Sequence, residues 1–213
     1  MANKGLIASV SLGFVLVLAQ IWMLTQADAL FPANPEVWKT ILIVYTLITA
    51  FVFSWDALSS RDTERKIFSI TFIKAFPKFL VGALITLVIL FAFGMIVKGN
   101  SLPTIKDALS NVGLAVILFH ALIVAVDEEL IFRGWLVNEL RAKKINEASV
   151  KWGQAIIFAG FHWAMTREIL LILIYIPLAF VFLYVRDKYS PKTQMANAGV
   201  HFAWNVFILG FMS

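Results

Sequence analysis

The chain has 213 residues, of which 61% are hydrophobic and only 15% are charged. Ordinary soluble domains are about 45–50% apolar, with glycine included, and about 25% charged. A soluble fold of this size could not keep so much apolar surface from water, which excludes a soluble enzyme, a disordered chain and a nucleic-acid-binding module. The sequence therefore predicts an integral membrane protein with lipid as its partner. The absence of cysteine excludes disulfides, thiolate metal sites and cysteine nucleophiles.

Seven segments are apolar and approximately long enough to cross a hydrocarbon core of about 30 Å as helices. They are 6–25, 37–55, 79–97, 109–136, 152–165, 169–185 and 195–212. The first is longer than the apolar region of a typical signal peptide, so we interpret it as a retained span. Residues 67–79 predict an amphipathic helix at the interface, which Pro77 would interrupt. The expected fold is an all-α, polytopic transmembrane helix bundle in which residues 1–213 form one domain.

Lysine and arginine are distributed unequally between the two sides of this predicted bundle. With the N-terminus inside, 13 of the 18 basic residues fall on the inner side, four fall on the outer side, and Arg133 lies within a span. Basic residues accumulate on the cytoplasmic side of membrane proteins. The distribution predicts seven crossings with the N-terminus inside and the C-terminus outside. The net charge of +5 follows from this flanking and indicates no acidic partner.

The fourth predicted span contains Asp-Glu-Glu-Leu-Ile-Phe-Arg at residues 127–133. Charges within a span are costly and face protein or a water-filled cavity. Glu129 and Arg133 are four positions apart, in the order that favours an ion pair on a helix. Glu128 points about 100° away from Glu129 and has no cation at helical spacing, so it is a candidate acid or base. The alternative is a helix end at the interface, although the apolar run continues to Leu136.

Two further spans carry polar residues at a similar depth. The fifth contains His162, and the seventh contains His201 and Asn205 on one helix face. Counting 1.5 Å per residue from the flanking basic residues places these three and Glu128 roughly 14–20 Å from the cytoplasmic boundary. We expect the four side chains to meet in one buried site that is reached from the cytoplasmic side. A single histidine in a span is otherwise a structural bundle residue, and we assign His120 to that class.

One glutamate, two histidines and one asparagine suit the activation of water. Glu128 could accept a proton from water as general base, with His162 positioning the water. His201 and Asn205 could donate hydrogen bonds to the oxygen of a tetrahedral intermediate. The same set could bind zinc through Glu128, His162 and His201. The sequence contains no His-Glu-x-x-His motif, however, and this favours metal-independent hydrolysis of an amide.

Three motifs on separate spans resemble those of the CAAX protease and bacteriocin-processing (CPBP, Abi) family. They are Glu-Glu-x-x-x-Arg at 128–133, Phe-x-x-x-His at 158–162 and His-x-x-x-Asn at 201–205. The resemblance covers about residues 109–213 and implies a family-like catalytic core of an intramembrane endopeptidase. It implies that Glu128 and His162 activate water and that His201 and Asn205 form the oxyanion site. The supporting or structural positions are Glu129, Arg133 and Phe158.

The resemblance also implies a membrane-associated peptide or protein substrate, either prenylated or bacteriocin-like. The family's use of a metal has been argued in both directions. We expect a prokaryotic plasma membrane, because the chain is small and has no sorting tail. A proton- or ion-coupled transporter is an alternative, since intramembrane Glu, His and Arg also form proton relays, but the sequence lacks the internal repeat that many transporters show. A non-catalytic membrane scaffold that retains the polar core is the second alternative.

Overall fold

The computed structural model describes residues 4–30, 35–58, 75–98, 114–166, 168–191 and 193–211. Within these residues the secondary structure is helical and contains no strand, which confirms the predicted all-α class. The helices are α1 Lys4–Thr25, α2 Ala27–Leu30, α3 Pro35–Leu58, α5 Phe76–Lys98, α7 Leu114–Glu128, α8 Val137–Ala142, α9 Glu147–Thr166, α10 Ile172–Tyr189 and α11 Met195–Phe211. A π-helix, η1 Glu129–Leu136, joins α7 to α8, and a 3-10 turn, η2 Ile169–Leu171, leads into α10.

The predicted apolar segments correspond to the long helices, with two differences. The segment predicted at 109–136 begins outside the described residues and continues without interruption through η1 into α8. The interfacial helix predicted at 67–79 lies mostly outside the described residues. Its Pro77 is in the first turn of α5, where the missing N–H removes no helical hydrogen bond.

Large apolar side chains cover the outside of the bundle. Leu173 on α10 is 71% exposed, and Leu84 on α5 is 65% exposed. Lipid, unlike water, accepts such a surface without a free-energy cost. Two helical stretches, Trp38–Trp55 and Ile169–Tyr189, are long and apolar enough to cross a membrane. The described part of the chain thus has the surface of a membrane protein, and the number of crossings stays a prediction.

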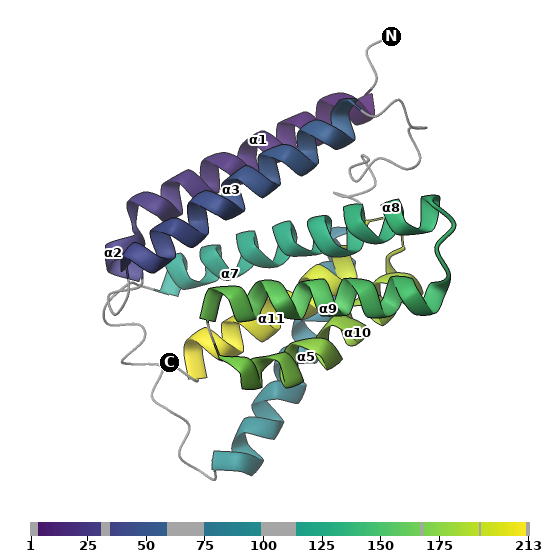
Figure 1. The fold of residues 1–213 in the computed structure, drawn as a ribbon. Helices are drawn as coiled ribbons and strands as arrows, with labels where there is room; N and C mark the ends of the chain where they lie inside the picture. Colours follow the sequence, from purple (N-terminus) through teal and green to yellow (C-terminus); the bar gives the residue numbers. More distant parts are fainter. Residues whose placement is uncertain are drawn as a thin grey trace.

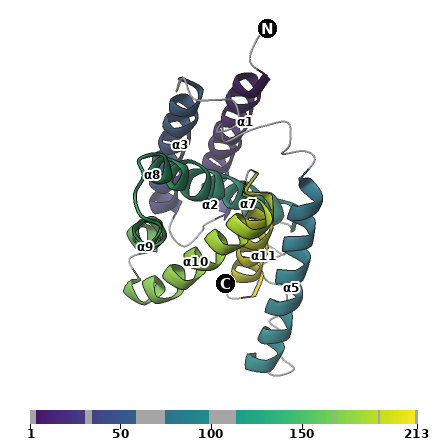
Figure 2. The ribbon, with the colours of Figure 1, turned by 90° about the vertical axis from the view of Figure 1, so that its right-hand side faces the viewer.

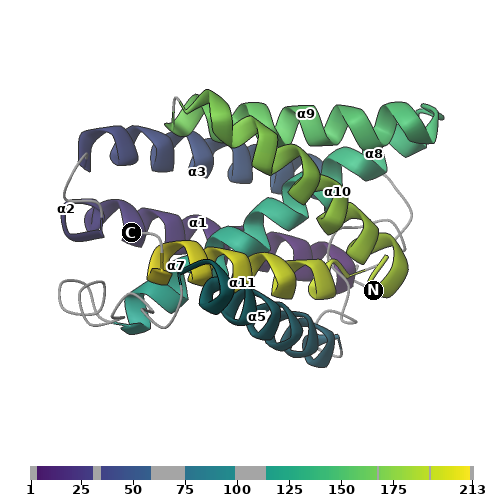
Figure 3. The ribbon, with the colours of Figure 1, turned by 90° about the horizontal axis from the view of Figure 1, so that it is seen from below.

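The helices surround a central rod formed by α7, η1 and α8. An antiparallel hairpin of α1 and α3 lies along one side of this rod, and α9 and α10 lie along another (Figure 1). α11 packs between α7 and α5, with α5 at the edge farthest from α3 (Figure 2). The start of α1 and the turn between α8 and α9 lie at one end of the molecule, whereas α2 and the end of α11 lie at the other (Figure 3).

Close packing of α5 against α11 fixes the position of the C-terminal helix. A Cβ atom added at Gly199 would collide with the carbonyl oxygen of Phe79, and one at Gly82 would collide with the carbonyl oxygen of Ala196. Small residues at such a crossing allow two membrane helices to approach closely. This contact holds α11, which carries His201 and Asn205, against the rest of the bundle.

Candidate active site

The charged cluster of the central rod is buried inside the protein. Glu128, the last residue of α7, is 2% exposed, and both Glu129 and Arg133 of η1 are 0% exposed. The helix then continues for six residues of α8, so the cluster is not a frayed or exposed helix end. π-Helical segments change the direction in which side chains leave a helix and are frequent at functional sites.

Glu128 lies beside both predicted histidines, which come from two different helices. Its Oε2 atom is 3.6 Å from Nε2 of His162 on α9 and 3.5 Å from Nε2 of His201 on α11. The Nδ1 atom of His162 lies 3.0 Å from the carbonyl oxygen of Phe158. Because a carbonyl oxygen only accepts hydrogen bonds, Nδ1 carries the hydrogen and Nε2 presents a lone pair toward Glu128. The carboxyl oxygen and the imidazole can therefore hold one water molecule between them.

Glu129 connects the π-helix to α11. Its Oε1 atom accepts a hydrogen bond from Arg133 at 2.9 Å and lies 2.8 Å from Nδ1 of His201. Its Oε2 atom accepts a short hydrogen bond from the side-chain amide of Asn197. The ion pair expected from the spacing of Glu129 and Arg133 is thus present. Glu129 also orients His201, so that the other ring nitrogen faces Glu128.

Aromatic rings enclose the charged groups. The guanidinium carbon of Arg133 lies 4.0 Å from the centre of the Phe158 ring, a favourable cation–π distance. Tyr175 stacks on His162 with ring centres 3.9 Å apart, and Phe182 stacks on His201 at 4.6 Å. Phe158 therefore supports the site in two ways, through its ring beneath Arg133 and through its carbonyl group at His162.

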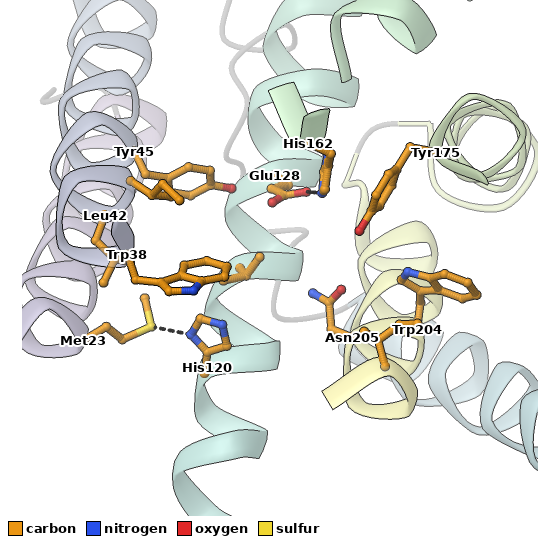
Figure 4. Close-up of a pocket in the computed structure, with 13 residues that line it drawn as sticks. Met23, Trp38, Leu42, Tyr45, His120, Glu128, His162, Tyr175, Trp204 and Asn205 are labelled. Carbon is orange, nitrogen blue, oxygen red and sulfur yellow. Dashed lines mark hydrogen bonds and ion pairs between the residues drawn. The ribbon is translucent and has the colours of Figure 1, made fainter. Parts of the chain in front are cut away.

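A pocket opens beside Glu128, and its walls come from both halves of the chain. Glu128, His162 and Asn205 line it, and Figure 4 shows all three facing the space between the helices. The hydroxyl group of Tyr45 points toward Glu128 from the side opposite His162, and Tyr175 borders the pocket as well. The remaining walls are formed by Met23, Trp38, Ile41, Leu42, His120, Val124, Trp204 and Ile208. A few polar groups among apolar walls are features of a site that binds and orients a partly apolar ligand.

The structure brings three of the four predicted catalytic side chains to the pocket and places the fourth directly behind it. Glu128, His162 and Asn205 line the pocket, whereas His201 contacts Glu128 and Glu129 and is only 2% exposed. His120, expected to be structural, lines the pocket too, with its Nδ1 atom 3.0 Å from Sδ of Met23.

Several residues of the site were not anticipated from the sequence. Asn197 precedes His201 by four positions, so the helical spacing that links His201 to Asn205 also indicates Asn197. Tyr45 and Tyr175 have no comparable sequence signal, because they reach the site only through contacts between distant helices. Asp127, next to Glu128, was overlooked although it is a charged residue within a predicted span.

Zinc bound by Glu128, His162 and His201 is the alternative that the sequence leaves open. Among the described residues, no group of three or more His, Asp or Glu side chains is arranged so that it could hold a metal ion. Glu128, His162 and His201, the set considered for zinc, therefore do not fit this role, and no reaction step is assigned to a metal.

Comparison with protein families matches residues 110–207 to the family described as type II CAAX prenyl endopeptidase Rce1-like. This part of the chain is therefore similar to an Rce1-like endopeptidase domain. The family consists of membrane-integral proteases. The Rce1-like domain begins just before α7 and ends within α11, so it includes every predicted catalytic residue, whereas α1, α3 and α5 lie outside it. Comparisons with curated proteins and with solved structures gave no match.

Proposed function

We propose that this protein is an intramembrane endopeptidase that uses water activated by Glu128 and His162 to hydrolyse a peptide bond of a membrane-associated substrate. The observation that supports this most strongly is the position of Glu128. Its Oε2 atom lies within 3.6 Å of the Nε2 atoms of two histidines, beside a pocket that also exposes Asn205. A carboxylate next to an imidazole lone pair and an amide donor is a suitable arrangement for general-base attack on a carbonyl group.

The reaction proceeds in two steps. Water lies between Glu128 and Nε2 of His162, Glu128 removes one proton, and the water oxygen bonds to the carbonyl carbon of the substrate. The carbonyl electrons move to the oxygen, which accepts hydrogen bonds from Asn205 and from Nε2 of His201, with His201 acting as an imidazolium whose Nδ1 donates to the Glu129 carboxylate. Glu128 then returns the proton to the amide nitrogen, the carbon–nitrogen bond breaks, and a carboxylic acid and an amine leave. Glu129 holds His201 in place throughout.

Pocket chemistry supports a substrate with an apolar part near the cleaved bond. The walls contributed by Met23, Trp38, Leu42 and Trp204 are apolar, and the catalytic groups Glu128, His162 and Asn205 line the same pocket. A prenylated or otherwise lipid-anchored peptide has this combination. A bacteriocin-like peptide that enters from the membrane also combines a cleavable peptide bond with an apolar part.

The test uses the purified full chain in lipid nanodiscs with a farnesylated peptide ending in Cys-aliphatic-aliphatic-X. Mass spectrometry should detect the released tripeptide, and a metal chelator should leave the rate unchanged. The same peptide without the farnesyl group shows whether prenylation is required. Absence of cleavage of both peptides, together with proton or ion flux in liposomes, would instead identify a transporter.

We further propose that the chain crosses a prokaryotic plasma membrane seven times, with the N-terminus inside and the site open to the cytoplasm. This topology requires the α8–α9 turn and α2 to lie on opposite sides of the membrane, and they lie at opposite ends of the bundle. Because the chain has no cysteine, single cysteines report topology directly. An impermeant thiol reagent applied to intact cells should label Glu36→Cys and leave Lys151→Cys unlabelled. The reverse pattern would contradict the orientation.

A further inference from the structure

A second buried polar cluster lies on the other side of the central rod and connects it to the α1–α3 hairpin. Oδ2 of Asp127 accepts hydrogen bonds from Gln20 of α1 at 2.6 Å and from Thr49 of α3 at 2.7 Å. Gln20 and Thr49 also contact each other at 3.0 Å, and all three side chains are 0% exposed. A buried carboxylate without hydrogen-bond donors is costly in free energy. The two donors therefore hold α1 and α3 against the central rod.

This cluster is continuous with the active site through one turn of α3. The Thr49 hydroxyl lies 2.9 Å from the backbone carbonyl oxygen of Tyr45, four positions earlier. Tyr45 is therefore on the same side of α3 as Thr49, one turn closer to the pocket. On the rod, Asp127 directly precedes Glu128. The two neighbouring carboxyl groups thus face different parts of α3. Asp127 binds Thr49, and Glu128 faces the side chain of Tyr45.

Tyr45 and Glu128 have complementary unpaired atoms. The Tyr45 side chain is buried, and its hydroxyl oxygen has no hydrogen-bond partner among the described residues; neither has Oε2 of Glu128. Figure 4 shows the hydroxyl group pointing toward the carboxyl group. Burial of a hydroxyl donor without a partner costs free energy, so its position beside a carboxylate indicates a use in the reaction rather than in packing.

We propose that Tyr45 is a further residue of the reaction centre, which donates a hydrogen bond to Glu128 during the reaction, and that Asp127, Thr49 and Gln20 are positioning residues that act through Tyr45. The inference rests on the proposed function of Glu128. It gives the α1–α3 hairpin, which lies outside the Rce1-like domain, a direct part in catalysis. Catalytic hydrogen bonds are often formed fully only when substrate is bound, which accounts for the open Tyr45–Glu128 contact.

The kinetic test compares substitutions that change one hydroxyl group each, with the farnesylated peptide as substrate. Tyr45→Phe should lower kcat about tenfold or more without a matching change in KM or in the melting temperature. Thr49→Val should lower kcat, Thr49→Ser should restore it, and Thr49→Val should cause no further loss in a Tyr45→Phe background. Wild-type turnover by Tyr45→Phe, or independent effects of Tyr45 and Thr49, would overturn the proposal.

A second test needs no activity and separates this proposal from the proposed function. The chain has no native cysteine, so Tyr45→Cys and Glu128→Cys can be introduced together and linked by a short bifunctional thiol reagent. The pair should link rapidly, and adding Thr49→Val should slow the linking, whereas adding Thr49→Ser should not. Linking without peptide cleavage by the wild-type chain would overturn the proposed function alone. If the pair fails to link, or if Thr49→Val does not change the rate of linking, the proposal that Thr49 positions Tyr45 beside Glu128 is wrong, even if the enzyme is active.

Discussion

Glu129 and His201 form the direct connection between the π-helix and the C-terminal helix, with 2.8 Å between Oε1 and Nδ1. The two residues are 72 positions apart in the sequence, and both are almost completely buried. Since Oε1 of Glu129 also accepts from Arg133, one carboxylate neutralises a buried cation and orients a proposed catalytic ring at the same time.

Glu129→Gln should therefore destabilise the protein strongly. Removing one member of a buried ion pair leaves the other charge unpaired, at a cost of about 3 kcal/mol or more. Chemical unfolding followed by tryptophan fluorescence would measure the change in the free energy of unfolding. The matched control is Glu36→Gln, which breaks an exposed pair with Lys39 and should leave stability unchanged. Equal stabilities of the two variants would contradict the role given to Glu129.

Asn205→Ala should separate catalysis from stability. Asn205 lines the pocket, and loss of one oxyanion donor typically lowers kcat by about 10²–10³-fold. KM for the farnesylated peptide and the melting temperature should change little, because Asn205 lines the pocket and is only partly buried. A variant with a raised KM and unchanged kcat would assign Asn205 to substrate binding instead.

Gly199→Ala should weaken the packing of α5 against α11. The added methyl group meets the backbone of Phe79, which cannot move aside as a flexible side chain would, and such overpacking costs about 1–3 kcal/mol. The matched control is Gly160→Ala on α9, where no atom lies within 4 Å of the added group. Melting temperatures in the same detergent provide the comparison, and similar values for both variants would rule out the close crossing.

The turn between α8 and α9 should respond to acid. Arg141 donates hydrogen bonds to Glu147 at 2.8 and 2.9 Å, and this contact lowers the pKa of Glu147 below its usual 4.5. A carboxyl group with a lowered pKa in the folded state stabilises the fold above its unfolded pKa, and this stabilisation is lost as the pH falls through the folded value. The effect should be small, since Glu147 is exposed. Melting temperatures between pH 7 and pH 3 should fall less for Glu147→Gln than for wild type, and identical slopes would contradict the pairing.

Residue patterns predicted the parts of the molecule that depend on local spacing. Apolar runs indicated the long helices, and a separation of four residues indicated the Glu129–Arg133 pair. The π-helix was not foreseen, because the sequence pattern of residues 129–136 carries no local signal for its wider turn. The role of α3 was missed for a related reason, since Tyr45 and Asp127 become neighbours of one site only when helices far apart in the chain pack together.

The most direct test of the central claim is the rate at which Glu128→Gln cleaves the farnesylated peptide in nanodiscs. The substitution keeps the size of the side chain and removes its ability to accept a proton, so turnover should fall at least about 100-fold. Glu36→Gln, at an exposed position that does not line the pocket, should cleave at the wild-type rate. Turnover by folded Glu128→Gln within a few-fold of wild type would contradict the account of Glu128 as the base that activates water.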